Sequence, residues 1–136
     1  MAQVDLTKSG IDLGIVTSNP DAMVAFYRDT LGFREEPSTP FPAGGTMHRL
    51  WCGDSLIKIV APDAAPAEKA APAPIPRASG YRYFTISVSN IDAMVAGCDA
   101  AGYKVAVPVT EVRPGVTIAM IEDPDGNWVE FLHTTG

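Results

Sequence analysis

The sequence predicts an α+β protein built from two modules, each consisting of a strand, a helix and three further strands (βαβββ). The first observation is a repeat: residues 18–25 read SNPDAMVA and residues 89–96 read SNIDAMVA, with one difference between them. The second is that an alternating apolar segment precedes each copy and a glycine, Gly32 or Gly102, ends each helical pattern. A supersecondary unit that occurs twice in this way indicates a tandem duplication, and equivalent positions of the two halves are the place to look for chemistry.

The first module spans residues 8–61. Residues 11–17 alternate and are rich in Ile, Leu and Val, which predicts a strand. Asn19 then suits a helix N-cap and Pro20 the first helical position, and Met23, Phe26, Tyr27 and Leu31 form one apolar stripe. Further strands are expected over 33–36, 46–52 and 55–61, with a Pro/Gly-rich break over 37–45 and a hairpin at Gly53-Asp54.

The second module, residues 80–136, repeats this order. A strand is expected over 82–88, a helix over 91–101, and strands over 103–112, 116–121 and 128–133. Residues 62–79, which contain five prolines, separate the modules and are expected to be an extended connector rather than a packed element. All of 1–136 is therefore expected to be one domain of two modules.

Composition limits the functional classes. The chain has 136 residues, 46% of them apolar, and a net charge of -6 without a cluster of Lys or Arg, which argues against a nucleic-acid partner. No apolar run suits a signal peptide or a membrane span, so we expect a cytoplasmic protein with no membrane partner. Cys52 and Cys98 are far apart and lack metal-site spacing, which predicts neither a disulfide framework nor a thiolate zinc site.

Two segments resemble a known family. FYRDTLGF at 26–33 and EDPDGNWVEF at 122–131 are similar to the vicinal oxygen chelate superfamily, which groups glyoxalases, bleomycin resistance proteins and extradiol dioxygenases. The resemblance implies paired βαβββ modules that form a curved mixed sheet, usually in a homodimer, with a small-molecule ligand in the cleft that the sheets enclose. Its members include metal-dependent lyases, epimerases, dioxygenases and thiol transferases, and metal-free proteins that sequester drugs.

The resemblance also implies a metal site with ligands in the order His, Glu, His, Glu on the first and last strands of each module. At the matching positions this sequence has Asp12, Lys58, Tyr83 and Glu130. Both histidines are missing, and a lysine ammonium repels a divalent ion. We therefore expect no metal or other cofactor; the only metal set that the residues leave open is Glu130 and Asp12 with His48.

Strand alternation supports placing these four residues on one face of the sheets. Phe84, Ile86 and Val88 are expected to pack on the helix while Tyr83, Thr85 and Ser87 face the cleft. By the same alternation, Lys58 and Glu130 point away from the apolar residues on either side of them.

The four-residue set has two interpretations that the sequence leaves open. In the first, it is a structural ion pair in which Asp12 and Glu130 neutralise Lys58 and the Tyr83 hydroxyl bridges them. In the second, it is catalytic: Glu130 or Asp12 is a general base, Lys58 stabilises an oxyanion or enolate, and Tyr83 delivers a proton.

Other residues are candidates for ligand binding. His48 is the only histidine expected at the cleft, and Trp51 is expected on the opposite face of its strand. Phe41, in the break at 37–45, could belong to a lid, and Trp128 could offer a stacking surface. The candidate ligand-binding residues are His48, Thr85, Ser87, Trp128 and Phe41.

Three function classes follow. The first is a metal-free binding protein of the bleomycin resistance type, for which the acidity of the chain and an aromatic surface suit a cationic, partly planar guest. The second is a metal-independent isomerase, lyase or hydrolase that uses Lys58, Tyr83 and a carboxylate. The third is an atypical divalent-metal lyase or dioxygenase.

Overall fold

The computed structural model of the chain describes residues 2–135, which form two compact units that meet in sequence between Ala67 and Glu68. In the first unit, the order of elements is β1 (Asp12–Val16), α1 (Pro20–Ala25), η1 (Phe26–Thr30), β2 (Arg34–Pro40), β3 (Gly45–Cys52) and β4 (Ser55–Pro62). Its four strands form one sheet in the order β1-β4-β3-β2. Strand β1 runs parallel to β4, and the other pairs are antiparallel.

The second unit has the same plan. Its elements are η2 (Ile75–Arg77), β5 (Tyr83–Ser87), α2 (Ile91–Ala100), β6 (Val105–Arg113), β7 (Val116–Glu122) and β8 (Trp128–Thr134). The strands are ordered β5-β8-β7-β6, with β5 parallel to β8. The predicted α+β class with two βαβββ modules is confirmed.

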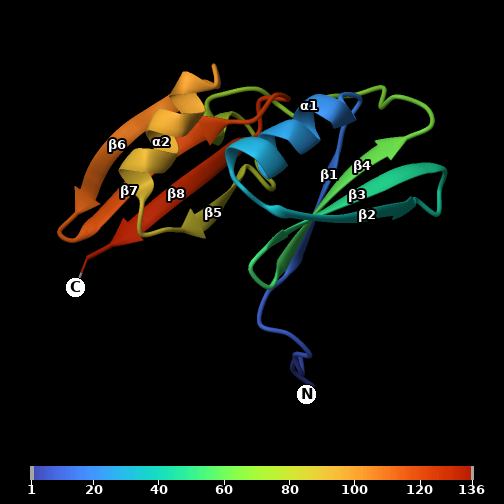
Figure 1. Cartoon of the computed structure of the whole chain (residues 1–136), viewed down its shortest axis with the longest axis horizontal. Helices are drawn as coiled ribbons and strands as arrows, with labels where there is room; N and C mark the ends of the chain where they lie inside the picture. Colours follow the sequence, from blue (N-terminus) through green and yellow to red (C-terminus); the bar gives the residue numbers. More distant parts are fainter. Residues whose placement is uncertain (1, 136) are drawn as a thin grey trace. The chain divides into compact units, whose positions relative to one another are not determined.

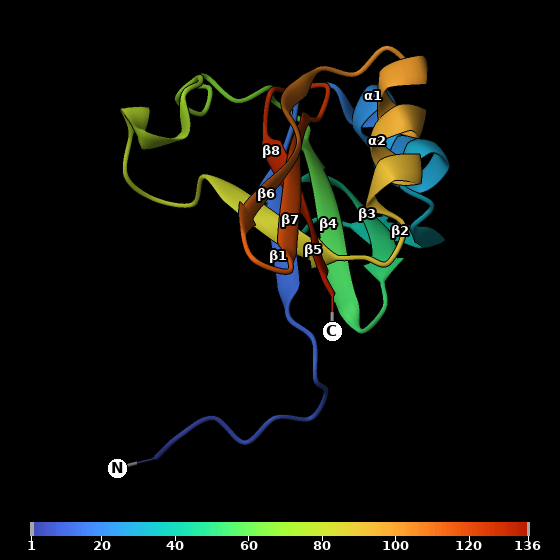
Figure 2. The same ribbon diagram turned by 90° about the vertical axis from the view of Figure 1, so that its left-hand side faces the viewer.

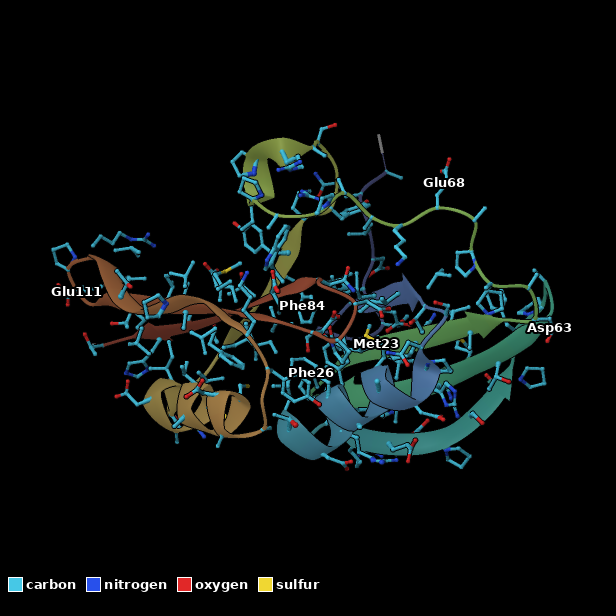
Figure 3. All side chains as sticks on the ribbon, turned by 90° about the horizontal axis from the view of Figure 1, so that it is seen from above. Met23, Phe26, Asp63, Glu68, Phe84 and Glu111 are labelled. Atoms are coloured by element: carbon cyan, nitrogen blue, oxygen red, sulfur yellow. The ribbon has the colours of Figure 1, made fainter. Side chains whose placement is uncertain are left out.

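The core of each unit lies between its helix and one face of its sheet (Figure 1). In the first unit, Met23 and Phe26 of the helical segment are fully buried (Figure 3), as are Leu50 and Ile59 of the sheet. In the second unit, Cys98 of α2 is buried on the same side as Val129 and Phe131 of β8. The expected apolar faces are therefore the faces that pack.

Each repeated segment begins a helix. Asn19 and Asn90 occupy the N-cap positions of α1 and α2, as expected for the first, but neither side chain makes a capping hydrogen bond. The Thr17 hydroxyl instead accepts a hydrogen bond from the backbone N–H of Asn19 at 2.8 Å. The first helix then widens into the π-helical turn η1 and ends before Gly32, whose φ of 84° is a conformation that favours glycine.

The EDPDGN segment forms the turn between β7 and β8. The carboxylate of Asp123 is buried and accepts hydrogen bonds from the backbone N–H groups of Asp125 and Asn127, both at 2.9 Å. The side-chain amide of Asn127 donates to the same carboxylate. One buried acceptor thus organises the turn that leads into β8.

Two expectations about irregular segments are wrong. Strand β2 continues to Pro40 instead of breaking at Pro37, because it is the edge strand and an edge position tolerates a residue without an N–H. Its pairing with β3 is irregular between Glu36 and Thr39. Phe41 consequently lies in the tight turn that follows, where its N–H donates to the Gly45 carbonyl, rather than in a long lid.

The connector is also more ordered than expected. Part of it forms η2, and the Arg82 guanidinium donates hydrogen bonds to the carbonyls of Ala71, Pro72, Pro74 and Ile75 at 2.8–3.1 Å. Figure 2 shows this green-to-yellow segment curling back on itself before β5. Within 2–135, no helix has both the length and the apolar character needed to cross a membrane.

Candidate functional site

The face of the first sheet opposite α1, here called the first open face, carries the predicted residues Asp12 and Lys58. The parallel register aligns Gly14 with Lys58, so Asp12, two residues earlier, projects from the same face. The Lys58 ammonium lies 3.3 Å from Asp12 Oδ2, and the ammonium of Lys8 donates a hydrogen bond to Asp12 Oδ1 at 2.5 Å. The pKa of Asp12 is lowered, chiefly by the Lys8 hydrogen bond and further by Lys58, against a smaller opposing effect of burial.

Arg49 and Trp51 share this face. In the antiparallel register, Arg49 stands opposite Lys58 and Trp51 opposite Leu56. The Lys8 ammonium lies 4.8 Å from the centre of the Trp51 ring, within the range of a cation–π interaction. Arg49 is paired with Glu36 at 3.1 Å. The first open face therefore combines one aromatic ring with a carboxylate that two lysines share.

His48 is not on this face. The register places it opposite Ile59, which is fully buried on the side that α1 covers. His48 and Trp51 thus occupy the reverse of their expected faces. The metal set that was left open, Glu130 and Asp12 with His48, loses its histidine, because His48 and Asp12 project from opposite faces of the sheet.

The corresponding second open face, opposite α2, carries the expected polar row of Tyr83, Thr85 and Ser87, all exposed. Thr85 stands beside Glu130 in the parallel register, and its hydroxyl donates a hydrogen bond to Glu130 Oε1 at 2.7 Å. Tyr83 is half exposed, and in the described part of the chain its hydroxyl makes no hydrogen bond to Glu130. The four predicted residues thus divide into an Asp12–Lys58 pair in one unit and a Glu130–Thr85 pair in the other, with Tyr83 apart.

Trp128 has its own partners. Its side chain is buried, its indole N–H donates to Glu122 Oε1 at 3.2 Å, and the Arg82 guanidinium lies 4.9 Å from the ring centre. One surface that was expected to stack on a ligand is therefore occupied by Arg82. Beside it is a pocket of about 400 Å³, whose walls include Lys69, Tyr81, Arg82, Glu122, Asn127 and Trp128.

Comparison with known proteins decides the family. The model of the Glyoxalase/Bleomycin resistance protein/Dioxygenase superfamily matches residues 11–131. The chain belongs to this superfamily. No curated protein matches the chain.

Several solved structures share its fold. A glyoxalase family protein from Bacillus cereus is 19% identical with a TM-score of 0.79, and the match covers 100% of this chain and 99% of that one. The protein SMU.1112c is 25% identical with a TM-score of 0.76, covering 93% and 99%. The trypanothione-dependent glyoxalase I of Leishmania major is 20% identical with a TM-score of 0.71, covering 90% and 84%. The Bacillus cereus and Leishmania major proteins are less than 25% identical to this chain, so their similarity indicates a shared fold and not a shared reaction.

The divalent metal common in the superfamily does not fit the residues found here. Lys58 stands where a carboxylate ligand is expected, and its ammonium is already paired with Asp12, the residue at another ligand position. Neither unit contains, among its described residues, a group of three His, Cys, Asp or Glu side chains placed to hold a metal ion. We therefore derive no chemistry through a metal.

The structure adds residues to the site that the sequence does not predict there. Lys8, Arg49 and Trp51 belong to the first open face, and Arg82 covers Trp128. The faces of Arg49 and Trp51 could have been read from the hairpin: a two-residue loop at Gly53-Asp54 pairs Cys52 with Ser55, and counting back pairs Arg49 with Lys58. The partners of Lys8 and Arg82 carry no comparable sequence signal.

Proposed function

We propose that this superfamily member binds a small organic molecule against the first open face without a divalent metal. The observation that carries the proposal is the Asp12 carboxylate, held between the ammonium groups of Lys8 and Lys58. A carboxylate shared by two cations is a poor metal ligand, because a divalent ion would have to displace or repel both of them. The Trp51 ring on the same face offers contact area of the kind that organic ligands use.

The test is a binding screen with and without metal. Protein treated with EDTA is screened against small organic molecules by thermal shift, and each ligand is then titrated in EDTA and in excess Zn²⁺ or Mn²⁺. We expect a ligand that raises Tm equally in all three conditions, and Trp51→Leu to weaken its binding by about tenfold, the loss of roughly 1.4 kcal/mol. Lys104→Met, at an exposed lysine of the second unit, is the matched control and should leave binding unchanged.

Two results would contradict the proposal. One is stoichiometric binding of a divalent metal together with ligand binding that disappears in EDTA. The other is a ligand whose affinity is the same in Trp51→Leu and in the unaltered protein, because such a ligand binds elsewhere.

One observation favours a second candidate, a metal-independent enzyme. The Thr85 hydroxyl fixes one oxygen of Glu130, so this carboxylate is held in place as a potential proton acceptor on the second open face. If a ligand found in the screen is turned over, Glu130→Gln should abolish turnover while binding persists. Absence of turnover of that ligand in the unaltered protein would leave binding as the function.

The homodimer implied by the resemblance belongs to the same proposal. Light scattering coupled to size-exclusion chromatography measures it directly: a mass near twice the 14.4 kDa of the chain is expected.

A further inference from the structure

The side chain of Lys8 is held like a bound ligand. Its ammonium lies 2.5 Å from Asp12 Oδ1 on one side. On the other side, it lies over the face of the Trp51 ring, 4.8 Å from the ring centre. Lys8 precedes β1, whereas Asp12 and Trp51 belong to two different strands of the sheet. An anionic group and an aromatic face that meet at one cation are the elements from which binding sites for organic ammonium ions are built.

The backbone that carries Lys8 is fixed in place. The Ser9 hydroxyl donates to Asp54 Oδ2 at 2.6 Å, and the Ile11 N–H donates to the Ser55 hydroxyl at 3.3 Å. A Cβ at Gly10 would collide with the backbone carbonyl of Asp54, so the chain passes the β3–β4 turn more closely than any other residue type allows. These contacts of the backbone and of Ser9 therefore place Lys8 against Asp12 and Trp51.

We propose that Asp12 and Trp51 form a binding site for an organic ammonium ligand, and that Lys8 is its built-in occupant, which the ligand displaces. The inference rests on the proposed function and names the class of its ligand. Lys58 remains on the second oxygen of Asp12, and the Arg34 guanidinium lies 5.9 Å from the centre of the Trp51 ring. Because these two cations repel further positive charge, the site takes a ligand with a single positive charge, and a quaternary ammonium group suits the ring face best.

Choline is the probe, and its neutral isostere 3,3-dimethylbutan-1-ol is the matched control ligand. The chain has two tryptophans, Trp51 and Trp128, so the ¹⁵N-labelled protein gives two indole N–H signals in an NMR spectrum. The signal that is missing in Trp51→Phe is that of Trp51. The titrations are run in EDTA at low ionic strength on the unaltered protein, Lys8→Met, the double variant Lys8→Met/Asp12→Asn, and Lys69→Met as a control lysine of the second unit.

We expect Lys8→Met to bind choline about tenfold more tightly than the unaltered protein, because the competing ammonium is gone. The Trp51 signal should shift and the Trp128 signal should not. The neutral isostere should bind at least about tenfold more weakly than choline, the double variant should lose the response, and Lys69→Met should behave as the unaltered protein does.

The proposal is overturned if Lys8→Met and the unaltered protein bind choline equally, or if neither binds it, or if choline and its isostere shift Trp51 alike. The backbone amide signals of both units report in each sample that the protein is folded. If choline fails while a screened organic molecule still binds in EDTA and loses affinity in Trp51→Leu, the ammonium site is wrong and the proposed function stands. If ligand binding requires metal, the proposed function is wrong whatever choline does.

Discussion

Asp12 is the residue on which the chemistry of the first open face depends. It accepts a hydrogen bond from Lys8, contacts Lys58, and occupies a position that is a metal ligand in the family that the sequence resembles. Replacing either lysine should therefore change the pKa of the Asp12 carboxyl group.

We predict that Lys8→Met raises the pKa of Asp12 more than Lys58→Met does. The Lys8 hydrogen bond is the largest cause of the lowered pKa, and the Lys58 contact is a smaller one. A ¹³C NMR titration of the Asp12 carboxyl in the three proteins measures this directly. An equal rise in both variants would show that the two lysines hold the carboxylate equally.

The same interaction makes a pH-dependent contribution to stability. Because the folded pKa of Asp12 lies below its ordinary value of 3.8, the contribution is present above that pH and is lost as pH falls through the folded pKa. Since the group is partly exposed, the effect should be small and salt-sensitive. The difference in urea midpoint between Asp12→Asn and the unaltered protein should shrink on acidification.

Side-chain faces could be predicted where strand alternation alone decides them. Tyr83, Thr85 and Ser87 point away from the helix as expected, since β5 pairs regularly with β8. The prediction for His48 is wrong, because the face of this residue depends on the pairing of β3 with β4, which sets His48 opposite the buried Ile59. The contacts of Lys8 could not be predicted, because they depend on where an irregular segment passes the β3–β4 turn.

At the scale of the elements, the segment before β5 receives several hydrogen bonds from one side chain. Four carbonyl groups of residues 71–75 accept hydrogen bonds from the single Arg82 side chain, which also lies over Trp128. Composition rightly indicated a segment without a strand or a long helix. It could not indicate that one arginine would organise it, because backbone carbonyls are available everywhere in a chain.

We predict that Arg82→Met makes this segment susceptible to trypsin. Cleavage after Lys69 and Arg77, which lie within it, should become several-fold faster, because local opening no longer breaks the Arg82 hydrogen bonds. Limited proteolysis followed by mass spectrometry identifies the cuts. Arg113→Met, at an exposed arginine at the end of β6, is the control. Unchanged cleavage in Arg82→Met would show that other contacts hold the segment.

At the scale of the whole molecule, each unit carries one cysteine, and the two differ in accessibility. Cys98 is fully buried on α2, and burial raises the pKa of its thiol to about 11. Cys52 of β3 is only half-buried, although burial also raises the pKa of its thiol. Both environments disfavour the reactive thiolate, Cys98 the more strongly.

We predict that iodoacetamide modifies Cys52 first and reaches Cys98 only when the second unit unfolds. Labelling at increasing urea, followed by peptide mass spectrometry, then reports the unfolding of the second unit through Cys98, with Cys52 as an internal reference. In full denaturant the two cysteines should react at similar rates, which controls for intrinsic reactivity. Rapid labelling of Cys98 in the native protein would contradict its burial.

The duplication preserved the strand order of both sheets and the register of their parallel strand pairs, while the side chains at matched positions changed. Gly14 pairs with Lys58 in the first unit as Thr85 pairs with Glu130 in the second. A Cβ at Gly14 would meet no atom within 4 Å, so this position has room for a threonine. The two pairs of positions are therefore equivalent: Gly14 and Lys58 could be replaced by Thr and Glu, or Thr85 and Glu130 by Gly and Lys. Such substitutions would give both open faces a glutamate, or both a lysine, at this position in place of the one of each that the natural chain has.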